Sequence, residues 1–245
     1  MSLTQTLRRP RAAIQHWLMR RLGLRIDRVA PRVPRADERT RFAYQQRHVD
    51  FGIAPGADVL DIGSGGDPFP YATVLVDRFT GPTQHRHAEL VRDGRRFVEA
   101  DIAALPFKDG EFDFVYCAHV LEHIDDPIAA CREMMRVARR GYIETPTLGK
   151  DALFAWNVRD MHKWHVVAIA GTLCFFELTP RQNEGIRSKE WQKLIFGPWR
   201  HPLQDAYFDN ADLFNVLFLW NEPFNVYVFG LDGSVRTLLN RPRSG

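Results

Sequence analysis

A glycine-rich turn lies between two carboxylates in this sequence. Each carboxylate closes a short apolar run, 57–62 and 73–77, of the kind that forms a buried parallel strand. Glycine lets the backbone turn sharply and approach a ligand closely, and an acidic residue at the tip of the next strand is how open α/β sheets hold a ribose. The pattern therefore predicts a nucleoside site. Its residues are Asp61, Gly63, Ser64, Gly65 and Asp77.

The turn is not the one that binds dinucleotides. That motif is Gly-x-Gly-x-x-Gly, with the pyrophosphate at the N-terminus of the following helix. Residues 63–68 read Gly-Ser-Gly-Gly-Asp-Pro, so the third glycine is absent and Asp67 would place a negative charge beside a pyrophosphate. The turn suits a ligand with a cationic or zwitterionic end. S-adenosylmethionine has a sulfonium and an amino-acid head, and it has no phosphate.

The elements that position these residues follow from the alternation of apolar runs and turns. Five runs are expected to form one parallel sheet, which makes the fold α/β. Asp126 and Pro127 predict the start of a helix that ends near residue 139. The interval between the first two runs is too short for an ordinary crossover, so residues 67–70 should cross with at most one helical turn. The runs are 57–62, 73–77, 97–101, 112–118 and 142–146.

Two further runs lie near the C-terminus. Residues 213–220 and 224–229 flank Asn-Glu-Pro, which predicts an antiparallel hairpin. A hairpin added to the five parallel strands gives an expected sheet of seven strands.

Taken together and in this order, the motifs resemble a class I S-adenosylmethionine-dependent methyltransferase of the small-molecule type. The resemblance spans about residues 56–146 and implies a Rossmann-like seven-stranded sheet, here with a shortened first crossover. The motifs that carry it are residues 59–65, Asp77, Asp101-Ile102, Leu105-Pro106-Phe107, residues 112–115 and His119-Val120-Leu121-Glu122-His123.

The resemblance implies S-adenosylmethionine as cofactor and assigns its contacts. Asp61 and the loop of Gly63, Ser64 and Gly65 would hold the methionine end. Asp77 would take the ribose hydroxyls. Asp101 and Ile102 would contact the adenine.

A cluster of titratable residues follows the fourth strand, where the family places its methyl acceptor. If a helix begins there, the spacing of His119, Glu122 and His123 puts all three on one face. The pattern resembles the Glu-x-x-Glu-His site by which some methyltransferases bind a divalent ion, so Mg²⁺ or Mn²⁺ is one expectation. A histidine base without a metal is a second, and a structural role is a third. The candidate catalytic residues are His119, His123 and Glu144, and His162 or His165 could complete either site.

Charge is distributed unevenly along the chain. Residues 1–41 hold eleven arginines and three acidic residues, a net charge of +8, whereas the remainder holds 22 basic and 27 acidic residues, a net charge of −5. Helical patterns at 11–24 and 36–50 predict a basic helical arm over residues 1–50, followed by a methyltransferase domain over 51–245. We expect the arm to be solvated or to pack on the acidic body or on a second protomer, so a homodimer through the arm or the C-terminal region is a candidate assembly. Contact with phosphate, a membrane surface or nucleic acid is the alternative.

The remaining composition bounds the cellular setting. The three cysteines are widely spaced, without a Cys-x-x-Cys pair, which is typical of a reducing compartment. No apolar run approaches the roughly twenty residues that span a membrane. We therefore expect a cytoplasmic protein.

The acceptor is the least defined part of the prediction. The aromatic-rich region of about residues 151–210 could wall an acceptor pocket or simply pack as core. The first hypothesis is O-methylation of a small polar acceptor such as a sugar or saccharide hydroxyl. A nucleic-acid methyltransferase is less favoured, because Ile143-Glu144-Thr145-Pro146 stands where base-flipping enzymes have an Asn-Pro-Pro-Tyr-like motif. A non-catalytic binding module that keeps the cofactor fold is the other alternative.

Overall fold

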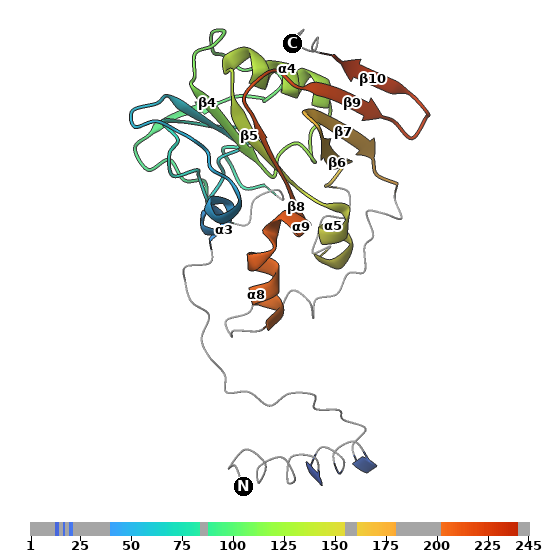
Figure 1. The fold of residues 1–245 in the computed structure, drawn as a ribbon. Helices are drawn as coiled ribbons and strands as arrows, with labels where there is room; N and C mark the ends of the chain where they lie inside the picture. The colour runs from blue at the N-terminus through green and yellow to red at the C-terminus, as the bar shows by residue number, and fades with distance from the viewer. Residues whose placement is uncertain are drawn as a thin grey trace.

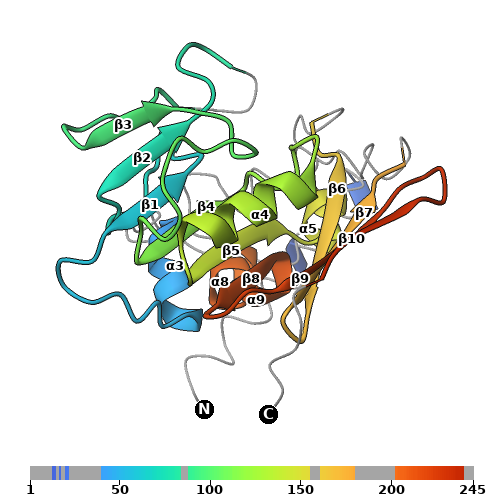
Figure 2. The ribbon, with the colours of Figure 1, turned by 90° about the horizontal axis from the view of Figure 1, so that it is seen from above.

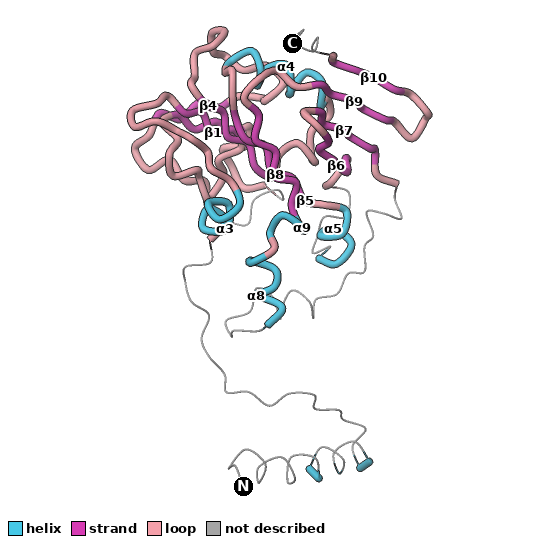
Figure 3. The backbone as a smooth tube through the Cα atoms, in the orientation of Figure 1, coloured by secondary structure: helices cyan, strands magenta, loops and turns pink. Residues whose placement is uncertain are grey.

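The computed structural model of the 245-residue chain describes residues 13–14, 17, 20–21, 40–83, 88–154, 161–179 and 202–239 (Figures 1 and 3). Within the predicted helix 11–24, the described residues are helical, and Ile14 and Trp17 are exposed. The rest of that helix and the segment that follows it to residue 39 lie outside the described residues, as do Trp156, Trp191, Phe196 and Trp199 of the aromatic-rich region.

The main sheet has six strands in the order β3-β2-β1-β4-β5-β8. The first five are parallel and β8 runs antiparallel to β5. All residues of β1, β2, β4 and β5 are buried, which is why they appear in the sequence as continuous apolar runs. The predicted α/β, Rossmann-like sheet is confirmed. The strands are β1 (Val59–Ile62), β2 (Val74–Asp77), β3 (Arg96–Glu99), β4 (Phe114–Ala118), β5 (Gly141–Pro146) and β8 (Asn215–Trp220).

A second sheet, of four strands in the order β10-β9-β7-β6, lies beside the first (Figure 2). The predicted terminal hairpin is therefore wrong, because β8 joins the main sheet while β9 pairs with β7 and β10. The ring of Phe224 packs on those of Phe218 and Trp220, with centroids 5.2 and 5.4 Å apart, so the chain folds over instead of reversing within one sheet. In the described residues the main sheet thus has six strands, not seven. The strands are β6 (Trp164–Ile169), β7 (Thr172–Glu177), β9 (Asn225–Phe229) and β10 (Val235–Leu238).

Helix α4 covers one face of the main sheet and begins where the sequence predicted. The Asp126 side chain caps it by accepting hydrogen bonds from the backbone N–H groups of Ile128 and Ala129. Its buried face packs on the side chains of Leu60 and Ile62 and on the second sheet. The helices are α3 (Arg41–His48), α4 (Pro127–Val137), α5 (Leu148–Phe154), α8 (Pro202–Asp209) and α9 (Ala211–Phe214).

Aromatic side chains cover the opposite face of the sheet. No helix occurs in residues 63–73, all of which are described, so the prediction of a short crossover with at most one helical turn is confirmed. Its Phe69 stacks on Tyr116 of β4 with ring centroids 4.0 Å apart, and Phe51 meets both rings edge-on. Aromatic rings thus occupy the place that a crossover helix would take.

Helix α3 also belongs to this face, since Tyr44 and Gln45 are buried against the sheet. Helix α3 packs as part of the body, although it lies within the arm that we predicted over residues 1–50, and the division at residue 50 stays a prediction. Among the described helices none is long and apolar enough to cross a membrane. The thiols of Cys117, Cys131 and Cys174 are free.

Candidate active site

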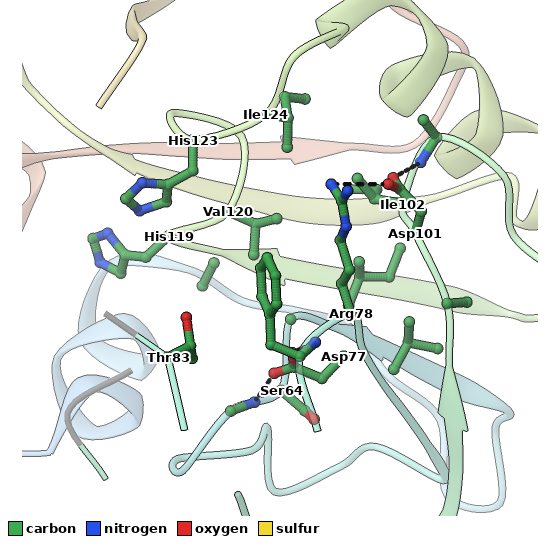
Figure 4. A pocket seen from close by; sticks show the side chains of 18 of the residues that line it. Ser64, Asp77, Arg78, Thr83, Asp101, Ile102, His119, Val120, His123 and Ile124 are labelled. Carbon is green, nitrogen blue, oxygen red and sulfur yellow. Dashed lines mark hydrogen bonds and ion pairs between the residues drawn. The ribbon is translucent and has the colours of Figure 1, made fainter. Parts of the chain in front are cut away.

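A cavity of about 690 Å³ opens at the carboxyl ends of β1, β2 and β4 (Figure 4). This position is the edge where open α/β sheets bind ligands, beside the point at which the strand order reverses between β1 and β4. Figure 4 shows Asp101 and Ile102 at one end of the cavity and the two histidine rings at the other. The predicted site residues that line it are Gly63, Ser64, Gly65, Asp77, Asp101, Ile102, His119 and His123.

The glycine-rich turn owes its shape to a close approach between chain segments. The backbone N–H groups of Gly63 and Ser64 both donate to the carbonyl of Val76, at 2.7 and 3.1 Å. Gly63 has a φ of 72°, and a Cβ on it would lie 2.3 Å from Cγ2 of Val120. Only glycine satisfies both the left-handed backbone and this contact.

Gly63→Ala is expected to lower the free energy of unfolding by about 2–5 kcal/mol, from backbone strain plus the clash with Val120. Gly56→Ala is the matched control, because Gly56 has a φ of 80° and nothing within 4 Å of its added Cβ. Gly56→Ala should lower the free energy of unfolding only by the backbone strain, about 1–2 kcal/mol. Urea denaturation measures both. The double variant Gly63→Ala/Val120→Ala should recover part of the difference, and equal costs for the two single variants would refute the steric explanation.

Asp77 lies where the ribose is expected, and the backbone of the turn fixes it. Its Oδ2 accepts the N–H of Gly65 at 3.1 Å, and its Oδ1 accepts the N–H of Phe79 at 2.8 Å. The carboxylate is 9% exposed and lines the cavity. These contacts orient Asp77 before any ligand arrives.

Asp101 defines the predicted adenine end. One of its oxygens accepts the N–H of Ala103 at 2.9 Å, and the other faces Nη1 of Arg78 at 3.1 Å. The ion pair between Arg78 and Asp101 is well exposed and stabilises the fold by no more than about 1 kcal/mol. The polar edge of a bound ligand can therefore take the place of Arg78 beside the carboxylate. Arg78 lines the cavity between Asp77 and Asp101, a position that the sequence analysis missed.

Asp61 is the predicted cofactor residue that does not line the cavity. Its Oδ2 accepts the N–H of Phe69 at 2.7 Å, and it is 2% exposed. Burial raises its pKa to about 7, against the opposing influence of the Phe69 hydrogen bond and of Arg41 and Arg95. Asp61 thus anchors the crossover beneath the turn, and its direct contact with the methionine end stays a prediction.

Arg41, the first residue of α3, lines the cavity beside the turn. Its Nη2 donates to the carbonyl of Asp67 at 2.5 Å and lies 3.5 Å from the Asp67 carboxylate. A guanidinium here could hold a ligand carboxylate. The sequence did not single it out, because it is one of eleven arginines in residues 1–41.

Glu144 lies behind the cavity at the centre of a buried hydrogen-bonded cluster. Its Oε2 accepts the side-chain N–H of Gln45 at 2.7 Å and the hydroxyl of Tyr142 at 2.6 Å. Its Oε1 accepts the hydroxyl of Tyr44 and faces Nε2 of His119 at 3.0 Å. Burial raises the pKa of Glu144, but the His119 hydrogen bond and the other donors outweigh it and hold the pKa at about 2.

His119 connects this cluster to a second buried carboxylate. Its Nδ1 lies 3.3 Å from Oε1 of Glu122, so both ring nitrogens face carboxylate oxygens. Because carboxylates only accept hydrogen bonds, a ring with a proton on each nitrogen satisfies both contacts. In this arrangement both N–H groups are committed to the two carboxylates, so the ring offers no lone pair with which to act as a base.

Residues 119–123 form no helix, so the condition under which His119, Glu122 and His123 would share one helical face is not met. The segment forms turns, and His119 has a φ of 58°, in the left-handed region that is uncommon for a residue with a side chain. The backbone N–H of His119 donates to the carbonyl of Glu144 at 2.8 Å, which continues the β4–β5 pairing at this point. His119 and His123 consequently do not share a helical face.

Among the described residues, Glu122, His123 and His162 form a group that could hold a cation, and the group shares Glu122 and His123 with the predicted set of His119, Glu122 and His123. One ligand atom from each lies within 4.8 Å of the others. His162 lies just before β6, and the rings of His123 and His162 meet edge-on with centroids 4.7 Å apart. The sequence analysis named His162 only as a residue that could complete a site. His165, its companion there, stacks on Phe176 in the second sheet.

The described architecture is an α/β domain with a cavity at the carboxyl ends of its parallel strands. Residues 49–143 match the family model described as "Methyltransferase domain", so this segment is an S-adenosylmethionine-dependent class I methyltransferase domain. The match ends before Glu144, His162 and the second sheet.

Named relatives match the chain over part of its length. The ubiquinone/menaquinone biosynthesis C-methyltransferase UbiE of Hahella chejuensis is 36% identical over 108 residues, which are 37% of this chain and 42% of the relative. Cycloartenol-C-24-methyltransferase 1 of Oryza sativa subsp. japonica is 30% identical over 135 residues, 48% of this chain and 37% of the relative. The matches thus span about two fifths of these relatives. A solved methyltransferase of Thermotoga maritima is 25% identical, with a TM-score of 0.31 over 40% of this chain and 47% of that chain.

Proposed function

We propose that this chain is an S-adenosylmethionine-dependent methyltransferase that acts on a small polar acceptor. The observation that carries the proposal is one continuous cavity, which joins the nucleoside end at Asp77 and Asp101 to the histidine end at His119 and His123. When bound, S-adenosylmethionine supplies an electrophilic methyl group on its sulfonium. A nucleophile held at the histidine end would lie beside that group.

The turn has unmet hydrogen-bonding capacity that fits this cofactor. Oγ of Ser64 is buried at the cavity wall and has no hydrogen-bond partner among the described residues. A polar ligand atom would satisfy it, and an unsatisfied buried hydroxyl costs about 1–3 kcal/mol. Arg41 beside the turn would take the methionine carboxylate, and the carboxylates around it would take the amino group.

The polar lining of the cavity supports a hydroxyl acceptor. Thr83, Asp125, Asp126 and Lys163 join the histidines in it. These side chains suit a sugar or saccharide hydroxyl, and we propose O-methylation on that basis. The alternative is a carbon acceptor, because the named relatives are C-methyltransferases. An acceptor carbon activated by a neighbouring hydroxyl would fit the same lining.

The candidate catalytic residues take different roles in this proposal. His119 and His123 line the cavity and would contact the acceptor. Glu144 does not line it, and so acts as a positioning residue that holds His119 through the 3.0 Å contact. His123 donates from Nδ1 to the carbonyl of Met161 at 2.9 Å, which leaves the lone pair of the neutral ring on Nε2.

Ligand binding and transfer test the proposal separately. At about 100 times its Kd, S-adenosylmethionine or S-adenosylhomocysteine should stabilise the full chain by about 2.7 kcal/mol. For a chain of this size that corresponds to a rise in Tm of roughly 5–10 °C. Failure of both ligands to raise the Tm would refute the proposal.

Transfer of a ¹³C-methyl group into pooled sugars, phenols and quinols should then give a methyl ether, which NMR distinguishes from a C-methyl product. Cofactor binding without any transfer would favour the non-catalytic binding module. A homodimer and a cytoplasmic location stay predictions.

A further inference from the structure

Glu122, His123 and His162 form a three-residue cluster, the Glu122 triad, at the histidine end of the cavity. Nε2 of His123 lies 3.8 Å from Oε1 of Glu122, too long for a hydrogen bond. Ligands of a tetrahedral ion with bonds of about 2.1 Å lie about 3.4 Å apart, so a small inward movement would bring these atoms to coordination distance. The converging atoms of all three residues lie within 4.8 Å of one another.

Each imidazole of the triad is held through its other nitrogen. Nδ1 of His162 lies 2.8 Å from the Asp151 carboxylate, and Nδ1 of His123 lies 2.9 Å from the carbonyl of Met161. Partners of these two kinds orient metal-binding histidines, because they place the proton on Nδ1 and the lone pair on Nε2. The two rings of this triad are oriented by the same kinds of partner.

Glu122 supplies a second, independent sign of a missing ligand. The residue is fully buried, and its Oε2 has no hydrogen-bond partner among the described residues. A carboxylate oxygen in that position is costly unless a cation or a donor reaches it. The His119 ring contacts only the other oxygen, Oε1.

We propose that the Glu122 triad binds a divalent transition-metal ion, such as Zn²⁺, Mn²⁺ or Fe²⁺, through two imidazoles and one carboxylate. Two nitrogen ligands favour such ions over Mg²⁺, which prefers oxygen. Of the three ligands His123 lines the cavity, so the ion would lie at the histidine end of the cavity wall. Three protein ligands with an open position are the arrangement of catalytic metal sites.

The role in transfer rests on the proposed methyltransferase function, whereas metal binding does not. An acceptor hydroxyl bound to the ion would lose its proton to water, since a metal ion lowers the pKa of a coordinated oxygen. The oxygen would then attack the methyl carbon as the carbon–sulfur bond breaks, and the electron pair of that bond stays on the sulfur. The products are the methyl ether, neutral S-adenosylhomocysteine and the released proton.

Cobalt(II) titration of the chelator-treated full chain tests the site without measuring turnover. We expect one Co²⁺ per chain, with visible d–d absorption of a low-symmetry site and displacement by Zn²⁺. His162→Ala should weaken Co²⁺ binding by more than about 100-fold. Asp151→Asn, which leaves all three ligands in place, should weaken it by roughly 10–100-fold.

His165→Ala is the matched control, because His165 lies three residues from His162 and stacks on Phe176 away from the triad. It should bind Co²⁺ as the wild type does. Absence of saturable binding in the wild type overturns the proposal, as does unchanged affinity in both His162→Ala and Asp151→Asn.

The shift in Tm with S-adenosylhomocysteine, measured in chelator, separates this inference from the proposed function. If that shift persists and Co²⁺ does not bind, only the metal site is refuted. If Co²⁺ binds and neither cofactor form raises the Tm, the metal site stands and the methyltransferase proposal fails.

Discussion

Asp77→Ala is expected to weaken S-adenosylmethionine binding by about 10²–10⁴-fold. The substitution removes a carboxylate that would accept both ribose hydroxyls, and each hydrogen bond to a charged group is worth about 1.5–3 kcal/mol. It also removes the acceptor for the N–H groups of Gly65 and Phe79, which hold the turn in shape. Titration calorimetry measures the affinity directly.

Two comparisons separate the ribose contact from folding. Asp77→Asn keeps one acceptor oxygen and should lose affinity by a smaller factor, roughly 10–100-fold. Glu99→Gln is the control, since Glu99 pairs with Asp77 in register on the neighbouring strand but is exposed and does not line the cavity. It should bind the cofactor normally. Near-wild-type affinity in a folded Asp77→Ala protein would move the ribose site elsewhere.

Glu144→Gln is expected to lower the free energy of unfolding by about 3–5 kcal/mol. The carboxylate is fully buried and accepts from two tyrosines, from Gln45 and from His119, and a glutamine has only one acceptor oxygen to offer them. Loss of one partner from a buried ionic cluster typically costs this much. Tyr142→Phe removes a single donor and should cost about 1.5–3 kcal/mol. Urea denaturation of both variants, with Glu99→Gln as the exposed control, measures the difference, and a cost below about 1 kcal/mol for Glu144→Gln would contradict the cluster's stabilising role.

The same cluster predicts the direction of pH dependence. Burial raises the pKa values of Glu122 and Glu144, but the His119 hydrogen bonds and nearby positive charges outweigh it and hold both pKa values at about 2, below their ordinary 4.5. Lowered carboxyl pKa values stabilise the fold above about pH 4.5, and that stability is lost as the pH falls towards 2. Asp61 acts oppositely, because its raised pKa stabilises below its ordinary 3.8 and the contribution is lost as the pH rises through about 7. Glu144→Gln should therefore show a shallower loss of stability between pH 5 and 3 than the wild type.

The sequence predicted the elements whose signals are local. The buried strands β1, β2 and β4 are mainly apolar runs, and Asp126 and Pro127 mark the start of α4 by capping chemistry that acts within three residues. The short crossover was predictable because the interval between β1 and β2 is too short for an ordinary crossover helix. Six of the seven predicted cofactor residues line the cavity. They follow the carboxyl ends of parallel strands, which meet at one edge of the sheet.

The structural features that the sequence did not predict depend on contacts between residues distant in sequence. β9 pairs with β7, which lies some fifty residues earlier in the chain. The local pattern of apolar and polar residues does not determine which sheet a strand joins. His119 has a left-handed backbone conformation where its N–H bonds to the Glu144 carbonyl on the next strand. The spacing between His119 and Glu122 therefore did not indicate a helix. His162 reaches Glu122 through the approach of β6 to the turn after β4, where the N–H of Lys163 donates to the Glu122 carbonyl at 2.7 Å.

The aromatic layer that replaces a crossover helix has a consequence for where the folding unit begins. The family match starts at residue 49, yet α3 precedes it and packs Phe42 against Phe69 and Tyr71, with ring centroids 5.7 and 5.5 Å apart. A chain truncated at residue 49 would lack α3, and the side chains of Phe51, Phe69 and their neighbours would be exposed to solvent. Exposed aromatic patches of this kind drive self-association. The shortest soluble version of the domain must therefore retain α3, although the family signature lies entirely beyond it.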